Sequence, residues 1–170
     1  GGFAFLDGAT FSATNLDVID PQGDQTYGVG VFATGRSIVT WLGGGVSGAI
    51  AASYTSGYTG GAVYLADSST FTGTALEFSE NLAYNGGAIE LTDGSTATLT
   101  NVEFADNTAH RDGGALRVYD SSEASCLNCE FDSNNADKGG AVDVSVDATF
   151  SDTNGVYTDN EATDQDGGGI

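Results

Sequence analysis

Residues 86–107 read GGAIELTDGSTATLTNVEFADN, and this pattern recurs about every 26 residues over most of the chain. Paired glycines stand at 60–61, 86–87, 113–114, 139–140 and 167–168. A second marker, an aromatic residue followed three positions later by asparagine, keeps the same period at Phe78/Asn81, Phe104/Asn107, Phe131/Asn134 and Tyr157/Asn160. Two independent markers on one period predict a repeat architecture.

Each repeat is typical of β-structure. After each glycine pair, apolar and variable residues alternate with period two, as in Ala88-Ile89-Glu90-Leu91. The variable column, predicted to face water because no interior would accept all its members, is Tyr64, Glu90, Arg117 and Asp143. A repeat this short cannot bury its own apolar face, but stacked copies can. The sequence therefore predicts an all-β, right-handed parallel β-helix of about six turns of roughly 26 residues.

Stacking assigns a structural role to the repeated side chains. The asparagines are expected to form a ladder of amide hydrogen bonds, beside a stack of the four aromatic rings. We expect residues 1–170 to form one β-helix segment of a longer chain, with four regular turns in 60–170 and two degenerate turns in 1–59. The glycine-rich residues 43–45 predict a protruding loop near residues 43–59.

The paired motifs resemble a known family. Gly-Gly-Ala followed by Ile, Leu or Val, together with Phe-x-x-Asn, is similar to the repeats of chlamydial polymorphic outer membrane proteins, and residues 86–107 look like a standard copy. The resemblance covers residues 60–170, with Tyr157 in place of Phe as a departure. It implies a surface-exposed β-helical segment of the kind found in autotransporter passengers, many of which are adhesins.

The charge balance excludes several partners. The chain has 170 residues, with 24 acidic and four basic side chains and a formal net charge of -20. A nucleic-acid-binding protein needs Lys and Arg to neutralise phosphates, so nucleic acid is excluded, and polyanionic glycans are disfavoured for the same reason. No apolar run is long enough to predict a transmembrane segment.

Acidic residues recur in columns. One outward column is predicted for Glu77, Glu103 and Glu130, and a corner column for Asp67, Asp93 and Asp120. Carboxylates on neighbouring strands repel by roughly 0.9 kcal/mol per pair even at the dielectric constant of water. These six residues are therefore candidate Ca²⁺ ligands, the only cofactor that the sequence suggests. The alternative is a hydrated surface that is screened by counterions.

Hydroxyl residues and cysteines give two further patterns. The outward threonines of residues 70–74 and 96–100 resemble the flat grid of ice-binding β-helices, although Glu123 and Leu127 interrupt it. Cys126 and Cys129, the only cysteines, replace two inward residues of the previous repeat. Two small core side chains and a local disulfide both remain open for this pair.

The expected function is that of an extracellular structural or adhesive rod, a surface stalk or a building block of filaments, without enzymatic activity. Its expected partners are neighbouring β-helical segments, copies of itself, or a cell-surface protein or glycan. An aromatic contact surface is predicted around residues 41–58, which include Trp41, Tyr54 and Tyr58. Ice binding, Ca²⁺-dependent binding and a carbohydrate-active enzyme on the same scaffold are the alternatives.

Overall fold

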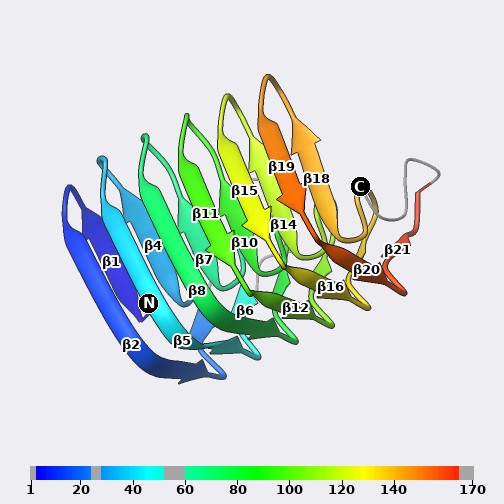
Figure 1. Cartoon of the computed structure of the whole chain (residues 1–170), viewed down its shortest axis with the longest axis horizontal. Coiled ribbons are helices and arrows are strands. Elements are labelled where there is room, and N and C mark those ends of the chain that lie inside the picture. The colour runs from blue at the N-terminus through cyan, green and yellow to red at the C-terminus, as the bar shows by residue number, and fades with distance from the viewer. Residues whose placement is uncertain (1–2, 24–27, 52–59, 165–170) are drawn as a thin grey trace.

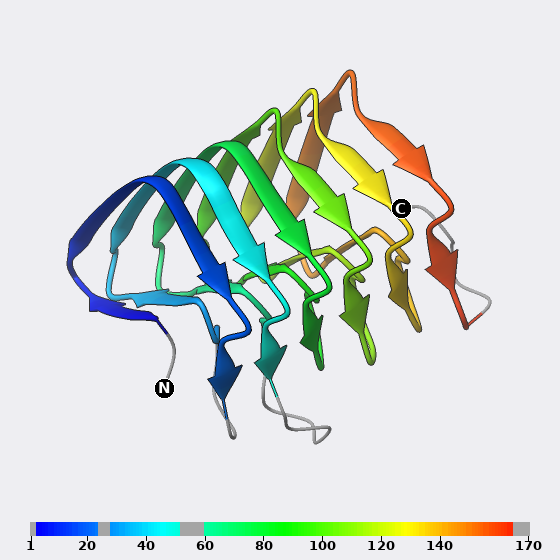
Figure 2. The same ribbon diagram turned by 90° about the horizontal axis from the view of Figure 1, so that it is seen from below.

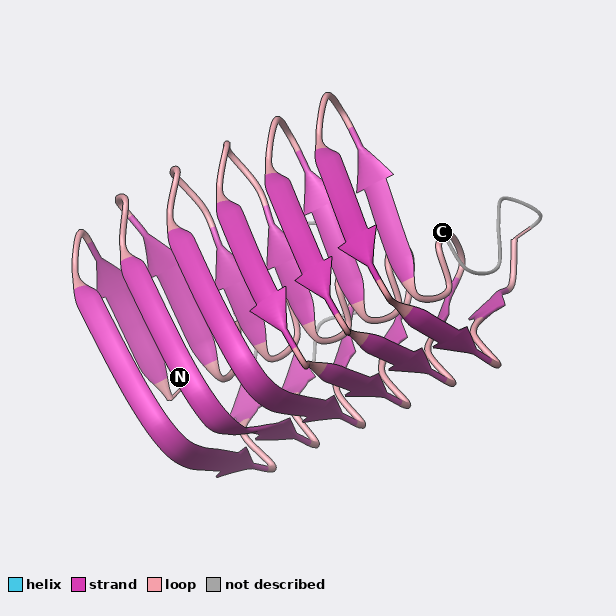
Figure 3. Ribbon diagram, viewed as in Figure 1, coloured by secondary structure: helices cyan, strands magenta, loops and turns pink. Residues whose placement is uncertain are grey.

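The computed structural model describes residues 3–23, 28–51 and 60–164, and every regular element in these ranges is a β-strand (Figure 3). The strands form three parallel sheets, which we call A, B and C. The chain passes through the three sheets in turn, and we call each pass a rung. Figure 1 shows the rungs following one another from the N-terminal to the C-terminal end, and Figure 2 shows the sheets enclosing a common interior.

Each sheet is assembled from equivalent strands of successive rungs. Sheet A contains β1 (Ala4–Asp7), β4 (Val31–Thr34), β7 (Val63–Leu65), β10 (Ile89–Leu91), β14 (Leu116–Tyr119) and β18 (Val142–Ser145). Sheet B contains β2 (Thr10–Ile19), β5 (Ile38–Ser47), β8 (Thr70–Ser79), β11 (Thr96–Thr100), β12 (Glu103–Ala105), β15 (Glu123–Leu127), β16 (Glu130–Asp132), β19 (Thr149–Thr153) and β20 (Val156–Thr158). Sheet C contains β3 (Gln22–Gly23), β6 (Ile50–Ala51), β9 (Leu82–Ala83), β13 (Thr108–Ala109), β17 (Asn135–Ala136) and β21 (Glu161–Ala162).

The register fixes the period of the coil. In sheet A the paired residues are Ala4, Val31, Val63, Ile89, Leu116 and Val142, so six rungs are related by steps of 27, 32, 26, 27 and 26 residues. The longest step joins rungs 2 and 3. The predicted parallel β-helix is therefore confirmed. Its period in rungs 3 to 6 is the one that the glycine pairs predicted.

The predicted loop near residues 43–59 is wrong for its first part. Residues 43–47 belong to β5 and residues 50–51 to β6, whereas residues 52–59 lie outside the described ranges. The glycines are required by close strand contact: an ideal Cβ on Gly45 would lie 1.8 Å from the carbonyl oxygen of Glu77, and one on Gly44 would lie 2.1 Å from that of Leu16. A glycine run therefore marks tight strand packing here.

The core is filled by large side chains that are matched to small neighbours. Trp41 is fully buried on β5 and pairs in register with Ala13 on one side and Gly73 on the other.

Further along sheet B, the predicted aromatic stack is present. The ring of Phe104 stacks on that of Phe78 at 5.4 Å and on that of Phe131 at 4.8 Å. Tyr157 continues the stack, with its ring 4.9 Å from Phe131.

The asparagines form the predicted ladder, a single hydrogen-bonded column between sheets B and C. The side-chain amide of Asn81 donates to Oδ1 of Asn107 at 2.8 Å, that of Asn107 to Oδ1 of Asn134 at 3.0 Å, and that of Asn134 to Oδ1 of Asn160 at 2.9 Å. Each of these acceptor oxygens also receives the backbone N–H of the preceding asparagine. The second amide hydrogen of Asn107 goes to the carbonyl of Phe78 at 2.9 Å. Buried amides thus satisfy one another from rung to rung.

A second polar column occupies the corner between sheets A and B, and sequence analysis missed it. The backbone N–H of each serine donates to Oγ of the serine in the next rung. The distances are 3.1 Å from Ser37 to Ser69, 3.2 Å from Ser69 to Ser95 and 3.2 Å from Ser95 to Ser122. All four serines are almost fully buried. The signal that would have found them is a serine on the same period as the asparagines.

Removing one asparagine tests the ladder. We expect Asn107→Ala to lower the free energy of unfolding by about 3 kcal/mol, because it strands the buried amide of Asn81 and the carbonyl of Phe78. Urea denaturation followed by circular dichroism measures this. The control is Asn101→Gly, which removes an exposed asparagine. In rung 2 the equivalent position is Gly43, so glycine is tolerated there. This variant should lower the free energy of unfolding by less than about 1 kcal/mol. Equal losses for both variants would contradict a structural role for the buried ladder.

Candidate functional site

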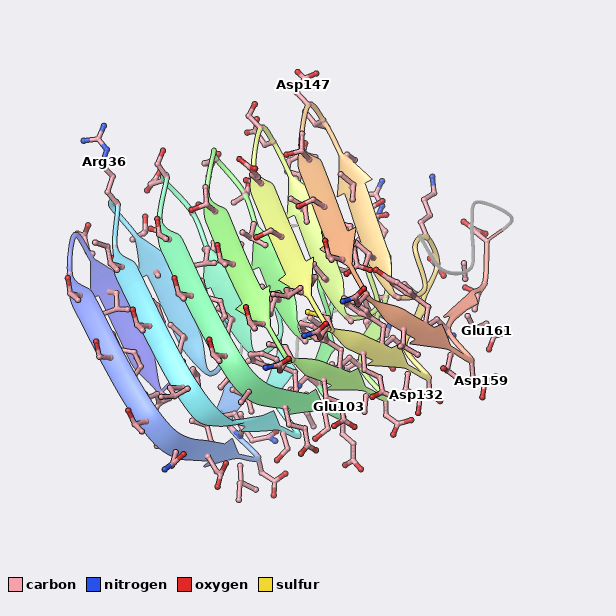
Figure 4. All side chains as sticks on the ribbon, viewed as in Figure 1. Arg36, Glu103, Asp132, Asp147, Asp159 and Glu161 are labelled. Carbon is pink, nitrogen blue, oxygen red and sulfur yellow. The ribbon has the colours of Figure 1, made fainter. Side chains whose placement is uncertain are left out.

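The structure places both groups of candidate Ca²⁺ ligands in columns. Glu77, Glu103 and Glu130 are paired in register on the outer face of sheet B, and all three are exposed. Asp67, Asp93 and Asp120 occupy equivalent corner positions with φ between 49° and 53°. Figure 4 shows Glu103 near one edge of the molecule, away from the corner tips that carry Arg36 and Asp147.

Repulsion within these columns changes their titration. Partial loss of hydration at the sheet surface, and then the negative charges of Glu77 and Glu130, raise the pKa of Glu103 above its ordinary value. Burial, and then the charges of Asp120 and Asp67, raise the pKa of Asp93 in the same way. The middle carboxylate of each column therefore binds a proton more readily than an isolated one.

The columns do not form a cage for a metal ion. Within the described ranges, no three His, Cys, Asp or Glu side chains lie close enough together to hold one. Neighbouring strands are about 4.8 Å apart, so the column spreads its carboxylates along the coil axis and does not converge them on a point. Ca²⁺ needs six to eight oxygen ligands, and a single column supplies too few. Ca²⁺ binding by these six residues stays a prediction.

A cleft of about 490 Å³ lies on the outer side of the bend in sheet B. It opens where Gly45 stands between Asp17 and Glu77 in the register and contributes no side chain. Asp17, Glu77 and Glu103 line it, together with uncharged residues such as Asn101. Because its charged residues are all acidic, this cleft is unsuited to a polyanionic substrate.

The outward hydroxyl residues form a surface that is continuous in its central column and interrupted in its flanking columns. We call the outward positions of residues 10–14, 38–42, 70–74, 96–100, 123–127 and 149–153 the hydroxyl face. Its central column carries a hydroxyl in every rung: Ser12, Thr40, Thr72, Thr98, Ser125 and Ser151. The positions without a hydroxyl are Ile38, Leu42, Glu123 and Leu127. The interruption at Glu123 and Leu127 therefore affects only the two flanking columns.

The prediction that the variable column of sheet A faces water is wrong. Glu90 is only 2% exposed and Tyr64 8%, while the side chains of Arg117 and Asp143 are 12% and 18% exposed. The backbone that leads into each of these strands folds back over the strand's own column residue: an ideal Cβ on Gly86, where φ is 51°, would lie 2.9 Å from Cβ of Glu90. Burial is possible because opposite charges are paired within the column.

Arg117 is the centre of that pairing. Its Nη1 lies 2.7 Å from Oε1 of Glu90, the residue in register on β10. Its Nη2 lies 3.2 Å from Oδ2 of Asp112, and its Nε lies 3.7 Å from Oδ2 of Asp143. The guanidinium group also sits over the ring of Tyr119, 4.3 Å from the ring centre. Three carboxylates and one ring thus surround a single cation.

The charged groups of the Arg117 cluster face one another and are mostly shielded from solvent. Nη1 and Nη2 of Arg117 each meet a carboxylate, whereas the buried Nε has no hydrogen-bond partner. Burial raises the pKa of Asp143 even though a hydrogen bond from Ser145 and the charge of Arg117 act the other way. Asp112 belongs to the segment that leads from sheet C into sheet A, so its bond to Arg117 fixes that segment on the sheet. The cluster therefore stabilises the fold locally.

The remaining candidates are in the interior or outside the described ranges. Cys126 and Cys129 are buried free thiols, and Cys126 pairs in register with Leu99. Trp41 cannot form part of the predicted contact surface because its side chain is fully buried. Tyr54 and Tyr58 lie outside the described ranges.

Comparison with protein families identifies the fold class. The family model for the right-handed β-helix region matches residues 7–170, which is nearly the whole chain. The chain therefore belongs to the right-handed β-helix family, and the predicted fold class is confirmed. This family includes enzymes and non-enzymes, so membership leaves catalysis open. No curated protein and no solved structure matches the chain.

The resemblance to polymorphic outer membrane protein repeats is narrower than this family match and stays a prediction. Over the described residues, the structure contains no helix with the length and apolar character that a membrane span requires.

Substitution of Arg117 tests the role of the cluster. We expect Arg117→Met to lower the free energy of unfolding by about 3 to 5 kcal/mol, since it leaves the buried carboxylate of Glu90 without this partner. Arg36→Met, at an exposed corner, is the matched control and should change stability by less than about 1 kcal/mol. Chemical denaturation at neutral pH measures both. A loss for Arg117→Met no larger than that of the control would show that the cluster contributes little.

Proposed function

We propose that this chain is a non-catalytic segment of an extracellular structural or adhesive rod. The observation that carries the proposal is the repetition itself: the asparagine column runs through rungs 3 to 6 and the serine column through rungs 2 to 5. Parallel strands that pair with both neighbours form a stiff spine, and a spine of this kind extends by adding rungs.

The charged residues support a non-catalytic role. The Arg117 cluster occurs once among the described rungs, and its charged groups are paired with one another and largely shielded from solvent. The acidic columns, by contrast, recur over several rungs and face solvent. A catalytic site requires a unique constellation that a substrate can reach, whereas repetition suits a surface with one character along its length.

The resemblance to polymorphic outer membrane protein repeats supports the extracellular location. The high negative charge keeps such a rod soluble and separates it from other acidic surfaces. Its partners in this proposal are further β-helical segments, copies of the chain, or a protein or glycan at a cell surface.

Labelling of source cells tests the location and the form. An antibody raised against the folded chain is applied to intact and to permeabilised cells, and immunogold electron microscopy locates it. The proposal predicts label outside intact cells, along stalks or fibres. Label that appears only after permeabilisation would contradict it, provided that an antibody to a cytoplasmic protein behaves as expected in both preparations.

The hydroxyl face favours ice binding as a second candidate function. Its central column is unbroken, and Glu123 is the only charged residue at its outward positions, in a chain with a net charge of -20. The hydroxyls repeat at about 4.8 Å between strands and about 6.7 Å along them. A flat, rigid and uncharged grid of hydroxyl and methyl groups can order water in two dimensions, whereas charges would hold water in other orientations.

An ice recrystallisation assay tests this candidate. If it holds, the folded chain slows crystal growth, Thr98→Tyr abolishes the effect by disrupting the flat central column, and Glu130→Tyr, on the far side of the bend, retains it. Circular dichroism confirms that both variants fold. Absence of any effect by the unaltered folded chain would eliminate ice binding and leave the rod proposal standing.

A further inference from the structure

Cys126 and Cys129 lie on the two sides of the bend in sheet B. Cys126 is in β15, Cys129 directly precedes β16, and Asn128 between them adopts a φ of 54°. Both side chains point into the core, where they are 4% and 1% exposed. Other rungs fill the same two positions with residues that cannot be cross-linked, such as Leu99 and Val102 in rung 4.

Neighbouring rungs show that side chains at these two positions converge. In rung 6 the positions are Asp152 and Gly155, and an ideal Cβ on Gly155 would lie 2.6 Å from Cγ and 1.8 Å from Oδ2 of Asp152. In rung 3 an ideal Cβ on Gly73 would lie 2.9 Å from Cδ1 of Leu76. The bend therefore directs the two inward side chains of one rung at each other, in rungs on both sides of the cysteines.

The cysteines follow the same geometry. Their thiols are close enough for each to shift the pKa of the other, and Sγ of Cys129 also lies 4.0 Å from the carbonyl oxygen of Leu99. A disulfide requires two Cβ atoms about 3.5 to 4.5 Å apart and side chains that point toward each other. The convergence in rungs 3 and 6 meets the second requirement without any change in strand register.

We propose that Cys126 and Cys129 form a disulfide that bridges the bend of sheet B in the fifth rung. The free thiols of the structure are the reduced form. The oxidant is a disulfide of the glutathione class. One cysteine thiolate attacks it, releasing one glutathione thiolate and forming a mixed disulfide, and the second cysteine displaces the other glutathione thiolate. The protein loses two protons and two electrons, and both glutathione molecules leave as thiols.

In the folded, reduced chain the two thiols shift each other's titration. The hydrogen bond from Cys126 lowers the pKa of Cys129, and the same bond, with burial, raises the pKa of Cys126. Because both side chains are buried in the folded chain, we expect oxidation to take place while the chain folds.

Thiol counting tests the proposal independently of the rod function. The purified chain is unfolded, refolded in a buffer of reduced and oxidised glutathione, denatured with an alkylating agent, and weighed by mass spectrometry. We expect no alkylation without a prior reductant, two alkylated cysteines with it, and an unalkylated mass that is lower by two hydrogen atoms than that of the reduced chain. Two alkylated cysteines without reductant, retained glutathione, or a disulfide-linked dimer would each overturn the proposal.

Two variants separate the cross-link from the packing. We expect Cys126→Leu with Cys129→Val, which copies rung 4, to fold and to melt at the same temperature with and without reductant. The unaltered oxidised chain should melt at a lower temperature after reduction. In the variant background, Leu99→Cys with Val102→Cys should recreate the disulfide one rung earlier. Failure of this second pair to oxidise would show that the bend does not supply the geometry.

Discussion

Every level of this structure depends on hydrogen bonds between equivalent residues of successive rungs. A rung alone has too little apolar area to be stable, and its strands have no partners within the rung. Stacking gives the backbone its parallel partners and satisfies the buried polar side chains at the corners. The asparagine column closes the turn between sheets B and C, and the serine column closes the turn between sheets A and B. Both columns require the same residue type at the same position in successive rungs, which explains the period of the sequence.

The same register determines the surface. Residues that repeat in sequence become neighbours about 4.8 Å apart, so each outward column acquires one chemical character. Glu77, Glu103 and Glu130 form an acidic column whose members repel one another, whereas the hydroxyl face stays nearly uncharged. On sheet A the column alternates in charge, and Glu90 and Arg117 are buried as a pair. A solenoid can therefore present different surfaces on its different sheets while its interior follows a single pattern.

The fold was predictable because period and alternation are both visible in one sequence. The period alone predicts the column of Asn81, Asn107, Asn134 and Asn160. The same period in serine indicates a second column at Ser69, Ser95 and Ser122. Burial of Glu90 was not predictable from alternation, which assigns a residue to a face of a sheet but does not show which segment covers that face. The loop expected near residues 43–59 was wrong for its first part, because the glycines at 43–45 mark close strand contact and not a turn. Arg117 and Glu90 could have been paired from the period, since opposite charges one repeat apart are neighbours in the coil.

Hydrogen exchange of the asparagine side-chain amides, followed by NMR, tests the stacking most directly. If the ladder is the structural basis of the coil, the amide hydrogens of Asn81, Asn107 and Asn134 exchange only when the chain unfolds, and their exchange slows as the chain is stabilised. The exposed asparagines 101, 128 and 154, which bond to one another at the surface, should exchange far faster. Equal exchange rates for the two groups would show that the buried column does not hold the rungs together.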